Sequence, residues 1–381
     1  MAASAIAGVR SDVDWPQFLE GHDLVWTEAP QAWHDGPFMG NGMLGSMLHQ
    51  VDAQTLRISL GRTDVEDHKK SGHGFLWQAR LPIGYFTLKT AGKITGFEGR
   101  LDLYNAETRV RVITDKGHLE IRAIVHSDDM LIAYEVIPTG GEAAKLDFVP
   151  LDAIAPARLQ SELEVKKYGD KAHKSRKSWA SVPYEYNPAP ILGQIDGYDT
   201  SRQLLEAGGE NGTAWTVLQD LSGRQELRVS IEHSYPAQTA TQDAIAHFEK
   251  VKGESLDSLI ERHRVWWHQY YPKSFISLDD TRMESFYWSQ VYKFGAGARK
   301  DRAFMDTMGP WMVENTAWAS GWFNLNTRLS YWFLSTANRL EVAESLFTKM
   351  DEKLPQLVAN MPEQYGDDCA GMSTCVPQTF I

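Results

Sequence analysis

The sequence contains few of the residues that build disulfide scaffolds or metal centres. Its 381 residues include two cysteines, Cys369 and Cys375, and no histidine lies near them. Two cysteines are too few for a disulfide framework, and a structural zinc site needs about four ligands. We therefore expect two ordinary thiols, no bound metal and no other cofactor.

Long apolar runs and an excess of positive charge are also missing. No stretch approaches the roughly 18 uninterrupted apolar residues of a membrane-spanning helix. Lys and Arg number 38 against 50 Asp and Glu, and the net charge of −12 argues against a nucleic-acid partner, because phosphates attract clustered cations. The residues before Trp15 hold a short apolar patch without a preceding basic segment, which makes a poor signal peptide.

Common catalytic motifs are absent. The chain has no Gly-rich phosphate loop, no Gly-x-Ser-x-Gly elbow, no zinc-binding His-Glu-x-x-His and no visible internal repeat. A chain of 381 residues exceeds one ordinary domain, so we expect two or three.

Apolar and polar residues alternate through much of the first 235 residues, which predicts half-buried strands. Many strands without intervening helices indicate antiparallel sheets packed as a large sandwich. The polar segment 166–198 is interpreted as a long loop or an irregular insertion. The strand-like stretches are 55–62, 100–127, 130–138, 213–221 and 225–234.

Around residue 240 the spacing of apolar residues changes from every second residue, as in a strand, to the spacing of a helix. The stretches 255–271, 279–299 and 326–350 repeat apolar residues at helical spacing, the first behind a possible Ser255 N-cap. The fold class is therefore α+β, with an antiparallel sandwich followed by packed helices.

Tryptophan and asparagine are concentrated in the helical half. Seven of the 13 tryptophans lie between Trp266 and Trp332, and Asn324 and Asn326 follow Trp322 closely. A side-chain amide both donates and accepts hydrogen bonds without adding charge, and indole faces pack against sugar C–H groups. Asn-x-Asn alone is a weak motif, because asparagine is an ordinary helix cap.

Three stretches resemble glycoside hydrolase family 95, which includes α-L-fucosidases and some α-L-galactosidases. They are Trp33–Asp64 with its Gly-Asn-Gly-Met-Leu-Gly, Arg100–Val112 with its Leu-Asp-Leu, and Gly321–Glu341 with its Asn-Leu-Asn and Tyr-Trp. The resemblance implies a super-β-sandwich at 1–238, a helical linker at 239–275 and the first part of an (α/α)6 barrel at 276–381. It also implies a fragment whose open apolar face is covered by a missing barrel half or an oligomer partner.

The family's reaction is inverting hydrolysis of a terminal α-L-sugar, which requires a general acid, a general base and an oriented water. By resemblance, Asn324 and Asn326 orient that water, while the acid and base lie in stretches that this chain does not have. The family comparison gives Asp306 and Glu314 no chemical role, and they are expected to form surface or structural salt bridges. Glu341 matches a family Glu, but on its helix it is expected to pack or cap.

The carbohydrate substrate is expected to contact Trp318 and Trp322, together with Asn41 and His68 from sandwich loops that can reach the barrel mouth. The stretch Gly61–Lys70 departs from the family pattern, so the identity of the preferred sugar is left open. A carbohydrate-binding protein without catalysis and a sibling-family glycosidase or phosphorylase are the alternatives. The resemblance favours a secreted or periplasmic location.

Overall fold

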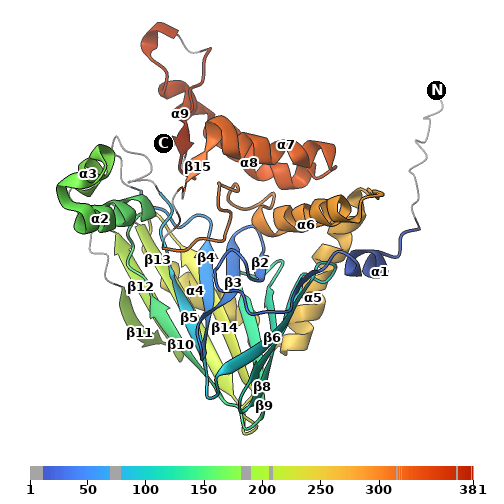
Figure 1. Cartoon of the computed structure of the whole chain (residues 1–381). Helices are drawn as coiled ribbons and strands as arrows, with labels where there is room; N and C mark the ends of the chain where they lie inside the picture. Colours follow the sequence, from blue (N-terminus) through green and yellow to red (C-terminus); the bar gives the residue numbers. More distant parts are fainter. Residues whose placement is uncertain are drawn as a thin grey trace, which may run out of the picture.

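The computed structural model describes residues 12–68, 79–181, 190–205, 209–314, 316, 318, 320–365, 368–378 and 380. These residues form two antiparallel sheets packed face to face, with helices against one sheet and across one end of the sandwich (Figure 1). The predicted order of a sandwich followed by helices is confirmed.

The larger sheet has nine strands within the described residues. Val110, Val112, Leu119 and Ile121 all face the core, as the alternation predicted. The strand order is β1 (Leu24–Trp26), β6 (Ile94–Asp102), β7 (Glu107–Thr114), β8 (Gly117–Val125), β9 (Ile132–Gly140), β14 (Gln225–His233), β13 (Gly209–Gln219), β12 (Tyr198–Leu205) and β11 (Ile191–Ile195).

The smaller sheet has five strands in the described part of the chain. Leu56 and Ile58 from β4, and Phe86 and Leu88 from β5, join the same core as the larger sheet, which makes the pair of sheets a sandwich. The strand order is β10 (Ala144–Pro150), β5 (Gly84–Thr90), β4 (Thr55–Arg62), β3 (Leu44–Asp52) and β2 (Phe38–Gly40).

Two helices cover the outer face of the larger sheet. In α4 (Ala240–Lys250), Phe248 packs against Tyr198, and in α5 (Leu256–Tyr270), Ile260 packs with residues of β8 and β9. Ser255 caps α5 by accepting a hydrogen bond from the Ser258 amide, as predicted.

Three further helices lie across the wide end of the sandwich (Figure 1). They are α6 (Thr281–Gly297), α7 (Arg328–Thr336) and α8 (Leu340–Glu352). The stretch 326–350, which carries one continuous helical pattern, divides into α7 and α8 because Asn338 adopts a φ of 53°. Two short helices, α1 (Trp15–Glu20) and α9 (Leu354–Ala359), belong to the same helical part. No helix among the described residues is long and apolar enough to cross a membrane.

The interpretation of 166–198 as a long loop is wrong for its described part. The chain forms α2 (Pro156–Tyr168), a 3-10 turn, α3 (Lys174–Ala180) and β11, whereas residues 182–189 lie outside the described residues. The buried residues of α2 include Arg158 and Ser161. A helix without an apolar face has no periodic signal, so the pattern could not reveal it.

Helices α6 to α8 leave large apolar side chains exposed. The exposed fractions are 60% for Phe286, 61% for Trp332 and 51% for Phe347. Exposed aromatic side chains on these helices, which the sequence predicts, are therefore present, and one continuous open face stays a prediction. Apolar surface of this kind marks interaction sites, and its occupant stays a prediction.

Glycines line the contact between the smaller sheet and the helical part. A Cβ atom on Gly40 would lie 2.5 Å from the Ala296 carbonyl oxygen, and one on Gly61 would lie 1.9 Å from that of Pro310. Gly42 has a φ of 86°, and its amide donates to the Ala296 oxygen at 2.7 Å. Backbone thus packs directly on backbone, which leaves no room for side chains.

Replacing Gly61 by alanine should destabilise the protein by about 3 kcal/mol, because an added methyl group overpacks a rigid backbone contact. The measurement is the free energy of unfolding in urea. Gly193 is the matched control, since it is a strand glycine whose Cβ would meet nothing closer than 3.8 Å. Gly193→Ala should change stability by less than about 0.5 kcal/mol. Equal effects of the two substitutions would contradict the role of the glycine contact.

Candidate functional site

The predicted amide pair lies on an exposed turn at the start of α7. The chain leaves β15 (Gly321–Trp322), which pairs with β16 (Cys375–Val376), and passes through a π-helical turn at Phe323–Thr327. Asn324 and Asn326 are both exposed, and neither side-chain amide has a hydrogen bond in the described part of the chain. Both amides are thus free to bind a ligand. We call this segment the amide turn.

Two indole rings stand next to the amide turn. Trp318 and Trp322 lie with ring centroids 4.4 Å apart and planes inclined by 40°. Trp318 is 52% exposed, and Trp322 directly precedes the turn. Trp318 thus contacts Trp322, and Trp322 precedes Asn324 by two residues along the chain. An exposed ring face of this kind suits a sugar, and a shared site of the four residues stays a prediction.

A cavity of about 330 Å³, here called the junction cavity, lies between the smaller sheet and the helices. Its walls combine aromatic and sulfur-containing side chains with the polar ends of Gln290, Lys293 and Ser330. The Ser330 hydroxyl donates to the Asn326 carbonyl oxygen at 3.0 Å, so the cavity ends about one helical turn from the amide turn. The apolar lining residues are Trp33, Phe38, Met47, Phe294, Met305, Met308 and Trp311.

The sequence predicts Asn324 and Asn326 in a pocket at this junction, with Trp318 or Trp322 on its wall. None of these four lines the junction cavity, whose indoles are those of Trp33 and Trp311. Trp33 precedes the Gly-Asn-Gly motif, but nothing in its local pattern marks it as a wall residue, because its partners are distant in the sequence.

The acids nearest to the amide turn in the sequence are held in ion pairs. Asp306 accepts from Arg80 at 2.9 Å and from the Met308 and Gly309 amides at 2.8 Å each, and both charged side chains are almost wholly buried. Glu314 accepts from Arg57 through both oxygens, at 2.8 and 2.7 Å. The expected salt bridges are therefore confirmed.

Electrostatics keeps Glu314 ionised. Burial alone would raise the pKa of Glu314, but the Arg57 guanidinium outweighs burial and lowers the pKa below its ordinary value. A carboxylate with a lowered pKa is a poor general acid near neutral pH. Glu341 is similarly paired with Lys273. Glu314 therefore lacks the protonated state that an acid catalyst requires, and Asp306 and Glu341 are held in ion pairs.

Asn41 lies inside a buried polar network rather than on an open surface. Its amide nitrogen donates to the carbonyl oxygens of His126 and Asp129, and its oxygen accepts from the Met43 and Leu44 amides. With 0% exposure and all these bonds made, the side chain fixes the turn between β2 and β3. It has no free group to offer a sugar in this arrangement.

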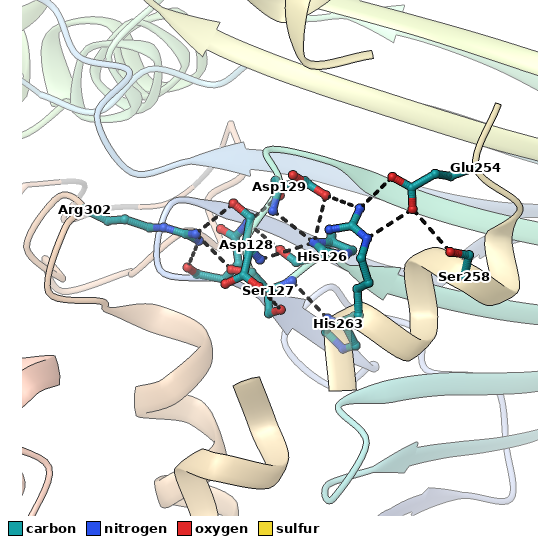
Figure 2. A network of polar contacts seen from close by, with 10 residues as sticks. His126, Ser127, Asp128, Asp129, Glu254, Ser258, His263 and Arg302 are labelled. Carbon is teal, nitrogen blue, oxygen red and sulfur yellow. Dashed lines mark hydrogen bonds and ion pairs between the residues drawn. The ribbon is translucent and has the colours of Figure 1, made fainter. Parts of the chain in front are cut away.

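The same network ties the helical part to the loop after β8 (Figure 2). Arg302 donates to the carbonyl oxygens of Ser127 and Asp128, at 2.9 and 3.2 Å, and also to that of Asn41. His263 accepts from the Ser127 amide at 3.0 Å. Burial lowers the pKa of His263 to about 3, so its ring is neutral and can accept.

His68 lies in a stack of rings at another part of the junction. Its ring packs on Tyr235, with centroids 3.8 Å apart, and its Nε2 atom lies 2.6 Å from that of His233. Burial, followed by the nearby His233, lowers the pKa of His68 to about 3. His68 lines a second cavity, of about 450 Å³, that shares no lining residue with the junction cavity.

No model of a known protein family matches the chain, and no curated protein does either. Among solved structures, the chain is similar to a putative kojibiose phosphorylase from the human microbiome, with a TM-score of 0.55 and 13% identity over 84% of this chain and 44% of that one. The chain shares its fold. A bacterial glucoamylase complexed with acarbose is also similar, with a TM-score of 0.46 and 7% identity over 88% of this chain and 54% of that one.

The chain therefore spans about half the length of these solved proteins. The predicted fold class is confirmed: an antiparallel super-β-sandwich is followed by a helical linker and part of an (α/α)6 barrel. At 13% identity the likeness concerns the fold alone, and the resemblance to family 95 stays a hypothesis.

Replacing Arg80 by leucine should destabilise the protein by about 3–5 kcal/mol, because Asp306 would be left as an unpaired buried charge. Chemical denaturation measures the change. Arg57→Leu is the control, because Glu314 is 31% exposed and its pair contributes about 1 kcal/mol or less. Adding Asp306→Leu to Arg80→Leu should restore much of the loss. A small effect of Arg80→Leu would show that the pair does not anchor the 306–309 segment.

Proposed function

We propose that this chain is part of a carbohydrate-active enzyme that cleaves the glycosidic bond of a terminal sugar. The observation that carries the proposal is the amide turn, where Asn324 and Asn326 stand free beside the Trp318–Trp322 ring pair. The fold shared with a kojibiose phosphorylase supports it, since that protein is named for acting on a sugar. Free amides and an exposed ring are groups that can hold a sugar or a water molecule beside it.

In this proposal the amides position the attacking water and the indoles hold the sugar ring. Inverting cleavage places a water between a carboxylate base and the anomeric carbon, and a carboxylic acid protonates the leaving oxygen. Asp306, Glu314 and Glu341 are ion-paired, so we take the acid and the base from other residues of the whole enzyme. The resemblance to family 95 favours α-L-fucosides or α-L-galactosides as substrates.

Phosphorolysis is the second candidate, because the similar solved structure is named a phosphorylase. In that reaction inorganic phosphate would take the place of water at the anomeric carbon. Product analysis distinguishes the two reactions: hydrolysis releases a free sugar in the absence of phosphate, whereas phosphorolysis requires phosphate and releases a sugar phosphate.

Sugar binding by this chain can be followed through tryptophan fluorescence. Titration with L-fucose or L-galactose should change the emission, because Trp318 is 52% exposed beside the amide turn. Trp318→Ala should abolish most of the change, and Asn326→Ala should weaken binding about tenfold through a lost hydrogen bond. Trp332, 61% exposed on α7, is the matched control and should be dispensable. An unaltered response in Trp318→Ala would exclude the ring pair as the sugar platform.

Activity tests the catalytic part of the proposal. In an enzyme that contains the whole barrel, Asn324→Ala or Asn326→Ala should lower kcat by roughly 10²-fold with a smaller effect on KM. The assay uses aryl α-L-fucoside and α-L-galactoside, with and without phosphate. The 381-residue chain alone should give no turnover. Clear turnover by this chain would assign the reaction to described carboxylates such as Glu314 and refute the mapping.

A further inference from the structure

The second cavity, of about 450 Å³, is a site that the proposed reaction does not use. Four parts of the chain line it: segments beside sandwich strands with His68 and Tyr235, the segment Lys300–Ala303 after α6, the last turns of α8 with the following Lys353, and Gln378. It includes neither residues of the amide turn nor Trp318 and Trp322. The ligand of this cavity can therefore be inferred without reference to the amide turn.

One wall of this cavity is an aromatic surface. The Tyr235 ring lies at 17° to the His68 ring, and His68 in turn stacks on His233 with centroids 4.9 Å apart. Tyr235 remains 39% exposed although His68 packs against its ring. A rigid, partly exposed ring offers an apolar face to the C–H groups of a sugar.

The charged groups of the lining leave positive charge uncompensated. Lys300 is paired with Glu344 at 2.7 Å and Lys349 with Glu352 at 2.9 Å. The Lys353 ammonium has no hydrogen bond or ion pair in the described part of the chain. The lining carboxylate of Asp64 is already bound by Arg62 at 2.6 and 3.1 Å.

Arg302 is a second cation of the lining, and within the described residues its carboxylate partner is distant. It is held by backbone carbonyl oxygens, and its nearest carboxylate, the 80% exposed Asp301, lies 4.0 Å away. Its Nε atom is buried without a hydrogen-bond partner among the described residues. Burial lowers the pKa of Arg302 despite the nearby acids. A buried cation without a close counter-ion is stabilised by a bound anion.

We propose that this cavity binds a sugar carrying an anionic group, either a phosphate or a carboxylate. The sugar ring packs on Tyr235, and the anion lies toward Lys353 and Arg302. This inference goes beyond the proposed cleavage reaction, because it assigns a second carbohydrate site with a different charge requirement.

Calorimetric titration of the 381-residue chain tests the site with glucose 6-phosphate, glucuronate, glucose and inorganic phosphate as probes. At least one anionic sugar should bind ten times or more tighter than glucose and than inorganic phosphate. The tighter of glucose 6-phosphate and glucuronate identifies the phosphate or the carboxylate as the group recognised. Equal binding of glucose and both anionic sugars would overturn the proposal, as would binding of inorganic phosphate as tight as that of the tighter anionic sugar.

Variants locate the ligand. Lys353→Met should weaken binding of the anionic sugar about tenfold, the loss of one charge-assisted hydrogen bond, and should leave the melting temperature of the free protein unchanged. Lys252→Met is the matched control, because Lys252 pairs with Glu249 alone among the described residues and lies outside the cavity lining. Asn324→Ala should also leave this binding unchanged, which separates the site from the amide turn. Unaltered affinity in Lys353→Met would refute the assignment.

Discussion

Glycines in and between strands β2, β3 and β4 let the backbone at the end of α6 and at Pro310 lie directly on the smaller sheet. Any side chain at Gly40 or Gly61 would meet a carbonyl oxygen at less than 3 Å, so glycine at these positions is required for this close approach. Helices α7 and α8 follow α6 along the chain, so their position depends on the same contact. The Gly-Asn-Gly motif is thus explained by packing.

Polar groups then fix the orientation that the glycines permit. Arg302 donates to the backbone oxygens of Asn41 and of the loop after β8 (Figure 2). The Asn41 side chain binds the same loop, and Arg80 and Asp306 hold the segment before Trp311. Leaving buried polar or charged groups unpaired costs free energy, so these contacts favour one arrangement of the sandwich and the helical part. Because Asn41 and Asp306 are fully engaged in this way, neither is free to contact a substrate.

Local patterns predicted the elements whose burial is periodic, and missed those whose burial is not. Strands β7 and β8 and helix α5 were recognisable, because one face of each packs against a core. Helices α2 and α3 carry no apolar stripe, and the break at Asn338 depends on a single left-handed residue. Local patterns could not predict the order of strands in the sheets either, since β9 pairs with β14, about 90 residues later in the sequence.

The cavities were unpredictable for a related reason, since each is lined by segments far apart in sequence. The junction cavity includes Phe38 and Trp311, and the second cavity includes Met43 and Arg302. Met43 of the second cavity directly follows Gly42, and Trp311 of the junction cavity directly follows Pro310, so each cavity borders the close contact between the smaller sheet and the helical part. Ligand sites beside that contact therefore depend on the same packing that holds the sandwich and the helices together.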